Sequence, residues 1–199
     1  MSQYFENKDK KINNQRNLVI TFKNKSYKFS TGDQIFSKDK LDYGTRLLLE
    51  NFTKEQINGS ILDLGCGYGA IGVILATIYP HITVDMVDIT DRAVFLSKKN
   101  AKHLSNVNVY QSSIYENVTS KYNYIITNPP IRAGKEVVKK FLIDAKNYLK
   151  QDGQLWFVMR KNHGVKSMNK ELEPFYDIKI IEKSKGFYII KCTKKLPTD

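Results

Sequence analysis

Three polar motifs in this 199-residue sequence combine residue types that could hold a small molecule and position a reacting group. The first runs from Asp63 to Gly69 and reads Asp-Leu-Gly-Cys-Gly-Tyr-Gly. Its glycines allow a sharp turn and let a ligand approach the backbone where a Cβ atom would clash. Because Gly65, Gly67 and Ala70 also match the dinucleotide pattern G-x-G-x-x-G/A, the glycines alone leave a nicotinamide cofactor open. No Gly-Lys-Ser/Thr follows, which excludes a P-loop.

The carboxylates of Asp63 and Asp88 narrow the choice of cofactor. Asp63 lies at the end of an apolar run and is expected to face the glycine loop, where it would repel a pyrophosphate but attract a cationic amino group. Asp88 ends the next apolar run and can accept hydrogen bonds from both hydroxyls of a ribose. In the purely structural alternative, Asp63 caps a plain turn and Asp88 is the N-cap of the following helix.

The third motif is Asn128-Pro129-Pro130-Ile131. Its prolines fix the backbone and remove two N–H donors, which leaves carbonyl groups directed into the site. The amide oxygen of Asn128 and a proline carbonyl can together accept both N–H groups of a planar –NH2 group, so that the nitrogen lone pair is oriented for attack on a sulfonium methyl. Such a displacement depends on positioning and electrostatics more than on a strong base. The motif therefore predicts methyl transfer to a planar amine.

Alternating strand and helix patterns must position these motifs. Five short apolar runs are predicted strands: 61–64, 84–87, 107–111, 124–127 and 155–159. Helical patterns lie between them at 70–79, 91–104 and 134–149. The alternation predicts an α/β fold with a parallel sheet covered on both faces, and all three motifs fall at the carboxyl ends of strands, where such sheets bind ligands.

The two ends of the chain have different patterns. Residues 1–16 are predicted to form a basic, loose tail, 17–30 a hairpin that turns at Asn24-Lys25, and 41–52 a helix. Two runs near the C-terminus, 175–181 and 187–192, predict an antiparallel hairpin that completes a mostly parallel sheet. Without repeats or internal linkers, the chain 1–199 is expected to form a single domain, whose core begins near residue 41.

Charge is the informative bulk property. Lys and Arg number 32 against 20 Asp and Glu, and the net charge of +12 suits a polyanionic partner, although by itself it is almost equally compatible with a merely soluble, Lys-rich surface. Four basic residues lie where the rim of the site is expected: Arg132, Lys135, Arg160 and Lys161. The sequence has no apolar stretch long enough for a membrane span and no secretory signal, so a cytoplasmic location is expected. Two distant cysteines and three scattered histidines predict no metal site.

Taken together, these motifs resemble those of class I S-adenosylmethionine-dependent methyltransferases. Within that class the chain is similar to the small-domain family of ribosomal RNA guanine-N2 methyltransferases that act on small-subunit RNA. The likeness extends from about residue 27 through nearly the whole chain. It is carried by Gly32, Phe36-Ser37, Leu41-Asp42-Tyr43-Gly44-Thr45, the loop 63–69, Asp88, Arg92-Ala93, Asn100, the run Asn128–Lys135 and Lys185-Gly186-Phe187.

The resemblance implies a Rossmann-like fold with a seven-stranded sheet and S-adenosylmethionine as cofactor. The loop residues Asp63, Gly65, Cys66, Gly67 and Gly69 would hold its methionine part. Asp88 would hold the ribose, Ser113 would border the adenine in place of the Asp or Asn of many relatives, and Asn128 would also line the cofactor.

On the substrate side, the resemblance implies that Asn128 and Pro129 bind the target amine and that Pro130 and Ile131 complete the turn. Ile131 stands where many amino methyltransferases have an aromatic residue that stacks on the flipped base, so Phe36 is expected to supply part of that stack. The expected substrate is guanine N2 in small-subunit (16S) ribosomal RNA, as free RNA or assembled subunit, and the expected enzyme is a monomer. The alternatives are adenine N6, a protein glutamine amide, or an NAD-binding enzyme or non-catalytic nucleotide-binding module.

Overall fold

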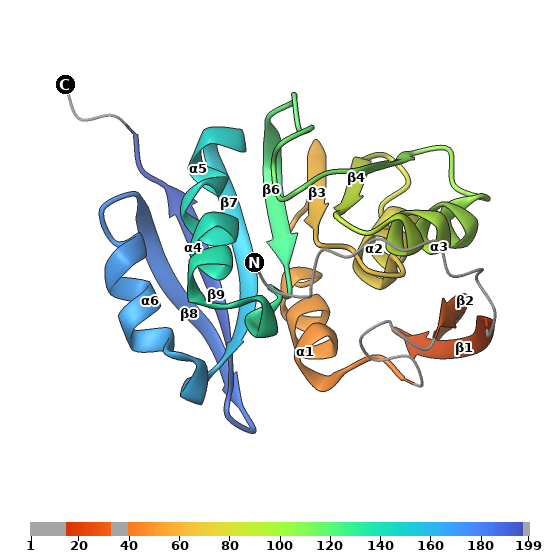
Figure 1. The fold of residues 1–199 in the computed structure, drawn as a ribbon, viewed down its shortest axis with the longest axis horizontal. Coiled ribbons are helices and arrows are strands. Elements are labelled where there is room, and N and C mark those ends of the chain that lie inside the picture. The colour runs from red at the N-terminus through yellow and green to blue at the C-terminus, as the bar shows by residue number, and fades with distance from the viewer. Residues whose placement is uncertain (1–14, 33–39, 197–199) are drawn as a thin grey trace.

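The computed structural model describes residues 15–32 and 40–196 of the chain (Figure 1). Its strands are β1 Gln15–Phe22, β2 Lys25–Gly32, β3 Ser60–Leu64, β4 Thr83–Asp88, β5 Val107–Gln111, β6 Tyr122–Thr127, β7 Leu149–Arg160, β8 Tyr176–Ser184 and β9 Phe187–Lys194. The helices are α1 Tyr43–Phe52, α2 Ala70–Ile78, α3 Asp91–Ala101, α4 Lys135–Ile143, α5 Ala145–Tyr148 and α6 Val165–Leu172, with 3-10 turns η2 Ile131–Ala133 and η3 Lys161–His163.

Seven of these strands form one sheet in the order β5-β4-β3-β6-β7-β9-β8. Neighbours from β5 to β7 run parallel, whereas β9 is antiparallel to both β7 and β8. The mostly parallel, Rossmann-like sheet with a C-terminal antiparallel hairpin is thus confirmed. The chain moves outward from β3 to β5 and then returns to β6, so the carboxyl ends of β3 and β6 flank the point where the strand order reverses.

Helices cover both faces of this sheet because successive strand residues point to opposite sides (Figure 1). Ile61 and Trp156 belong to a buried cluster with residues of α1, α2, α3 and the β1–β2 hairpin. Their neighbours Leu62 and Phe157 belong to a second cluster on the other face, with residues of α4, α5 and α6. This double burial explains why the central strands are continuously apolar rather than alternating.

The β1–β2 hairpin forms a separate two-stranded sheet. Phe22 pairs with Lys25, so the turn residues are Lys23 and Asn24, one position earlier than predicted. Both have positive φ (47° and 60°), the conformation that suits the twist of a two-residue hairpin. Of the predicted tail, residues 1–14 lie outside the described part of the chain, and Gln15 already belongs to β1.

The predicted helix over 134–149 is helical over most of its length but is not continuous. It divides at Asp144 into α4 and α5, and Leu149 already begins β7. The reason is tertiary: the Tyr115 hydroxyl donates to the carbonyl of Phe141 at 2.7 Å, and the Tyr176 hydroxyl to that of Leu142 at 3.0 Å. Side chains that bind the carbonyls of a helical turn interrupt its backbone ladder.

Helix α6 had no counterpart among the predicted elements. Val165, Met168 and Leu172 form its buried face at helical spacing. The pattern covers only eight residues between Gly164 and Pro174, which is short for a helix signal in sequence.

Within the described residues, no helix is both long and apolar enough to cross a membrane. The same part of the chain holds no group of three or more His, Cys, Asp or Glu side chains arranged for a metal ion. Cys66 and Cys192 are both buried and free.

Candidate functional site

The glycine loop joins β3 to α2 and is anchored on the neighbouring strand β4. The backbone N–H groups of Gly65 and Cys66 both donate to the carbonyl of Val87, each at 2.9 Å. Gly69 has a φ of +88°, and a Cβ atom added there would lie 2.7 Å from the methyl carbon of Met86. Glycine is required at this position for both reasons, and the loop is thereby held in one shape.

Helix α3 holds the loop from the other side. The Ser97 hydroxyl donates to the carbonyl of Gly67 at 2.7 Å, and the Asn100 amide donates to that of Tyr68 at 2.8 Å. The Cys66 thiol lies 3.4 Å from the Ser97 hydroxyl, and burial raises the pKa of this thiol well above its ordinary value. Cys66 therefore faces α3. Sequence reasoning missed Ser97, although its spacing of three from Asn100 places both on one helix face.

Asp88 contacts the loop directly. Its Oδ2 accepts the N–H of Gly67 at 3.0 Å, while Oδ1 accepts both the N–H and the hydroxyl of Thr90, at 3.0 and 3.1 Å. The N-cap of α3 is Thr90, whose hydroxyl accepts from Ala93, so Asp88 does not cap this helix as the structural alternative required. A carboxylate offers about four acceptor positions, and three are used by these bonds, which leaves Asp88 capacity for one further hydroxyl group.

Asp63 lies beneath the loop rather than facing it. Its side chain is completely buried, and Oδ2 accepts the N–H of Gly72 in the first turn of α2 at 2.8 Å. Among the described residues Oδ1 has no hydrogen-bond partner. Burial raises the pKa of Asp63 to about 7, against the stabilising bond from Gly72 and with a smaller contribution from the charge of Asp88. Asp63 thus caps α2 and keeps one unsatisfied acidic oxygen under the loop.

Asn128 follows β6 and is oriented by the start of α1. Its Nδ2 donates to the hydroxyl of Thr45 at 2.9 Å and to Oδ1 of Asp42 at 3.3 Å. Because an ionised carboxylate only accepts, the amide nitrogen must be the atom that faces Asp42. The amide oxygen is therefore presented on the opposite side as an acceptor. Asp42 is itself fixed, because it is the N-cap of α1 and accepts the N–H of Thr45 at 3.0 Å.

Pro129 and Pro130 differ in whether their carbonyl groups are already hydrogen-bonded within the turn. Pro129 is buried, whereas the carbonyl of Pro130 accepts the N–H of Ala133 at 2.9 Å and closes the turn that begins at Ile131. This bond leaves the carbonyl of Pro129 as the candidate second acceptor. The end of β6 is tied to the end of β3 by the buried Thr127 hydroxyl, which donates to the carbonyl of Leu64 at 2.8 Å.

Ser113 is exposed just after β5, and Phe36 lies outside the described residues. Arg132, Arg160 and Lys161 are exposed.

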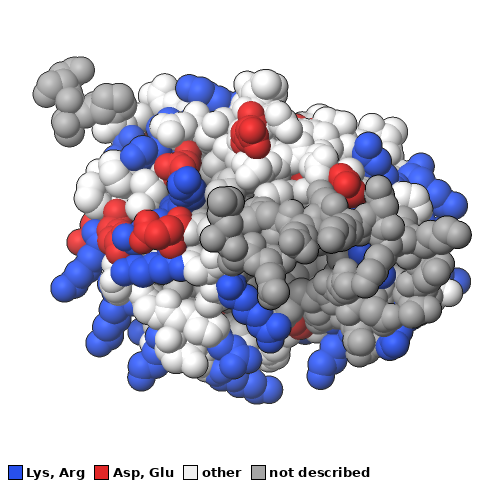
Figure 2. Space-filling model, in the orientation of Figure 1, with Lys and Arg blue, Asp and Glu red and all other residues white. Residues whose placement is uncertain are grey.

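Lys135 is also exposed, but it pairs with Glu171 of α6 at 3.3 Å, so its charge is partly neutralised. Figure 2 shows that basic side chains nevertheless predominate on this face and gather along its lower edge.

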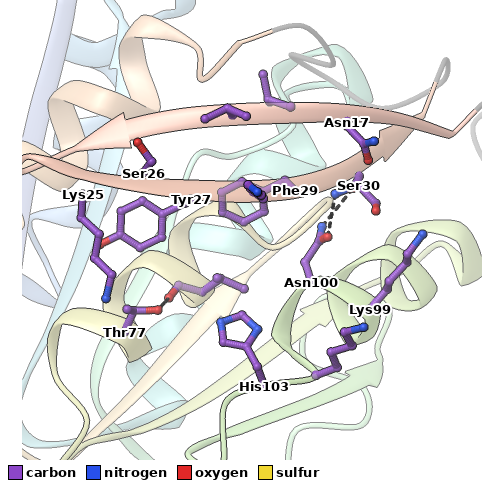
Figure 3. Close-up of a pocket in the computed structure, with 15 residues that line it drawn as sticks. Asn17, Lys25, Ser26, Tyr27, Phe29, Ser30, Thr77, Lys99, Asn100 and His103 are labelled. Carbon is purple, nitrogen blue, oxygen red and sulfur yellow. Dashed lines mark hydrogen bonds between the residues drawn. The ribbon is translucent and has the colours of Figure 1, made fainter.

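A separate cavity of about 750 Å³ lies between the β1–β2 hairpin and helices α2 and α3 (Figure 3). Asn100 lies at its margin and links the hairpin to the loop, since its amide exchanges hydrogen bonds with the backbone N–H and carbonyl of Ser30, at 2.7 and 2.9 Å. None of the predicted site residues lines this cavity.

The fold and the loop geometry are those of a Rossmann-like methyltransferase. The chain belongs to the methyltransferase small-domain family, whose model matches residues 26–191. The expected class of protein is therefore confirmed, and the family gives no support to the nicotinamide-dependent alternative.

Individual relatives agree with this family. The chain is 40% identical over 196 residues to the uncharacterized protein YbxB of Bacillus subtilis, covering 96% of this chain and 98% of that protein. It is 30% identical over 166 residues to ribosomal RNA small subunit methyltransferase C of Psychromonas ingrahamii, covering 81% of this chain but only 47% of that protein. It shares its fold with the T. thermophilus 16S rRNA N2 G1207 methyltransferase (RsmC), solved with AdoMet and guanosine. The TM-score is 0.81 at 23% identity, covering 91% of this chain and 51% of the other.

S-adenosylmethionine, the cofactor expected from the sequence, is supported by this family and fits the residues present. Asp63 Oδ1, which has no hydrogen-bond partner among the described residues, would accept from the amino group of the cofactor, and Asp88 retains one acceptor position for a ribose hydroxyl. A Cβ atom added at Gly67 would meet no atom of the described residues within 4 Å, so those residues leave the backbone there open to a ligand.

The raised pKa of Asp63 predicts a stability that depends on pH. The folded protein keeps this proton up to about pH 7, whereas an unfolded chain with the ordinary value of 3.8 has lost it. The contribution of the protonated carboxyl is therefore present below about pH 4 and is lost as the pH rises through about 7. An Asp63→Asn variant cannot ionise, so its melting temperature should improve relative to the native chain between pH 5 and pH 8. Asp152→Asn, at an exposed carboxylate, is the control. An equal offset at both pH values for Asp63→Asn would contradict this assignment.

Proposed function

We propose that this protein transfers a methyl group from S-adenosylmethionine to an exocyclic amine of an RNA base, specifically N2 of guanine in small-subunit ribosomal RNA. The observation that carries the proposal is the orientation of Asn128. Its amide nitrogen is bound by Thr45 and Asp42, so its oxygen is free to accept an N–H of the substrate. We also propose that the protein acts in the cytoplasm.

In this mechanism the chain acts by positioning. S-adenosylmethionine supplies an electrophilic methyl group on a sulfonium. Asn128 Oδ1 and the carbonyl of Pro129 accept the two N–H groups of the planar amine, which fixes its plane and directs the nitrogen lone pair out of that plane. The bonds strengthen as positive charge develops on the nitrogen, so they favour the transition state over the bound substrate. No side chain needs to remove the proton before attack.

Two observations support RNA as the polymer and guanine as the base. The net charge of +12 suits a phosphate backbone. The relatives named ribosomal RNA small subunit methyltransferase C, and the N2 specificity in the name of the T. thermophilus enzyme, point to the same substrate. This chain spans about half the length of those proteins, so the substrate is carried over as a proposal.

The experiment is transfer of an isotope-labelled methyl group to small ribosomal subunits, naked ribosomal RNA and total protein, followed by nucleoside analysis and mapping of the modified base. Label in N2-methylguanosine supports the proposal. Label in N6-methyladenosine or in glutamine of a protein would replace it with one of the alternatives that the same Asn-Pro-Pro turn could serve. An Asn128→Ala sample run in parallel excludes label from a contaminating enzyme.

Thr45 is expected to act as a positioning residue through Asn128. Thr45→Val keeps the shape of this buried side chain but removes the oxygen that holds the Asn128 amide at 2.9 Å. Loss of one such bond, about 1.4 kcal/mol, should lower kcat about tenfold. The KM for the cofactor should be unchanged, and Thr45→Ser should restore the rate. Equal losses in the Val and Ser variants would indicate a merely structural residue.

A further inference from the structure

A cluster of two aromatic rings and two cations lies beside Asn128. The roles assigned to the catalytic turn do not account for this cluster. It consists of Tyr43, Arg160, Lys185 and Phe187, and is called here the ring–cation patch. We propose that this patch binds single-stranded RNA next to the target nucleotide, with a base stacked over Arg160 and a phosphate at Lys185. The inference rests on the proposed function, since it names how the same site holds its polymer.

The patch is continuous with the candidate site through the start of α1. Asp42, which binds the Asn128 amide, is followed directly by Tyr43, whose ring lies 5.6 Å from that of Phe187. The Tyr43 hydroxyl is 2.7 Å from the Ser184 hydroxyl, which fixes the helix start to the β8–β9 hairpin. A base held on this patch would therefore be a near neighbour of a base held by Asn128.

Each ring carries a cation. Arg160 and Phe187 are a direct cross-strand pair of β7 and β9, and the Arg160 guanidinium carbon lies 4.5 Å from the centre of the Phe187 ring. The Lys185 ammonium lies 4.8 Å from the centre of the Tyr43 ring. Lys185 and Gly186 form the two-residue turn of the hairpin, with φ of 48° and 78°, so the turn presents Lys185 at its tip.

Among the described residues, these two cations have no carboxylate partner. Arg160 and Lys185 are exposed, and neither forms a salt bridge within residues 15–32 and 40–196. Lys135 and Lys139, on the far side of the catalytic turn, instead share Glu171. The ring–cation patch therefore offers positive charge that no carboxylate of the described residues neutralises, in contrast to Lys135 and Lys139. The β8–β9 turn lies at the bottom of Figure 1, at the edge where basic side chains gather in Figure 2.

An unpaired guanidinium supported by an aromatic ring suits an unstacked nucleobase. Proteins recognise single-stranded RNA by stacking bases on aromatic rings and on arginine guanidinium planes, while nearby cations bind the phosphates. In a duplex, stacking between neighbouring base pairs covers the faces of the bases. The combination of planar cation and unpaired ammonium therefore favours a single strand over a double helix and over a protein partner.

The hairpin supplies a matched control on its other face. Ser184 and Phe187 are paired and face α1, whereas Lys183 and Tyr188 are the next pair and face the opposite side. The Lys183 ammonium lies 5.3 Å from the centre of the Tyr188 ring, and Lys183 is exposed. Lys183→Gln thus removes a cation from the same kind of contact in the same hairpin, on the face opposite to α1.

The test measures binding of the full chain to a fluorescent single-stranded RNA by anisotropy, without cofactor and over a range of salt concentrations. Arg160→Gln is expected to weaken binding about tenfold, and Arg160→Lys to weaken it nearly as much, because lysine keeps the charge but cannot stack. Lys185→Gln should reduce the dependence of log affinity on log salt by about 0.7, one phosphate contact to a single strand. Lys183→Gln should leave both quantities unchanged, and a duplex of the same sequence should bind more weakly.

Several outcomes would overturn the patch. Native RNA affinity in Arg160→Lys would show that charge alone, without stacking, explains the binding. Equal losses of affinity in Lys183→Gln and Lys185→Gln would show that RNA does not bind specifically at the patch. Displacement of RNA by polyglutamate at equal charge concentration would favour an acidic protein partner instead. Failure of the proposed function is distinguishable from failure of the patch. If only the proposed function fails, RNA binding still depends on Arg160 and Lys185, but no RNA base carries the label. If RNA is methylated but the Arg160 and Lys185 substitutions leave RNA affinity unchanged, the patch is wrong and the proposed function stands.

Discussion

Replacing Asn128 by alanine is expected to reduce methyl transfer to RNA by a factor of about 100 to 1,000, the usual cost of removing one preorganised polar contact to a transition state. The affinity for S-adenosylmethionine should change little. The reason lies in the geometry: the amide nitrogen is committed to Thr45 and Asp42, so the oxygen is the atom left for the substrate amine. Single-turnover rates, with cofactor affinity measured by titration calorimetry, give the two quantities separately.

The direction of the amide can be tested by exchanging groups. Asn128→Asp alone would place a second carboxylate about 3.3 Å from Asp42 and should inactivate the enzyme through repulsion between like charges. In the double variant Asp42→Asn with Asn128→Asp, the donor moves to position 42 and an acceptor still faces the substrate. Partial recovery of the rate is expected relative to Asn128→Asp. If Asn128→Ala retains more than a tenth of the native rate, the amide does not have the assigned role.

Replacing Asp88 by alanine is expected to weaken S-adenosylmethionine binding by about 10- to 100-fold, with a normal rate once the cofactor is saturating. A charged acceptor that binds one ribose hydroxyl contributes about 1.5–3 kcal/mol, which corresponds to this loss of affinity. The same change removes the partner of the Gly67 N–H, so the glycine loop also loses a contact that shapes it. Calorimetric titration of cofactor, compared with kcat at saturation, separates this effect from that of Asn128.

Two controls sharpen the result for Asp88. Asp88→Asn keeps one acceptor oxygen and should lie between the native chain and the alanine variant. Asp91→Ala removes an exposed carboxylate in the first turn of α3, three residues after Asp88, and should bind cofactor normally. An Asp88→Ala protein with native affinity would show that the carboxylate serves only the loop and Thr90.

Local patterns determined the framework of this protein. The alternation of apolar runs with helical spacing was sufficient for the parallel sheet, and the runs of glycine and proline located the loop at 63–69 and the turn at 128–131. These signals depend on backbone geometry and on burial, which neighbouring residues decide. The short helix α6 and the break at Asp144 escaped prediction. The first is brief, and the second is caused by tyrosines distant in the chain.

Only the tertiary structure decided how the side chains of the site are used. It placed Asp63 under the glycine loop, paired Lys135 with Glu171, and set Asp42 and Thr45 against Asn128 across more than eighty residues of sequence. The sequence by itself identified the residue types that the chemistry needs. Their orientation and free charge depend on partners brought together by packing of distant elements, and no local pattern specifies those partners.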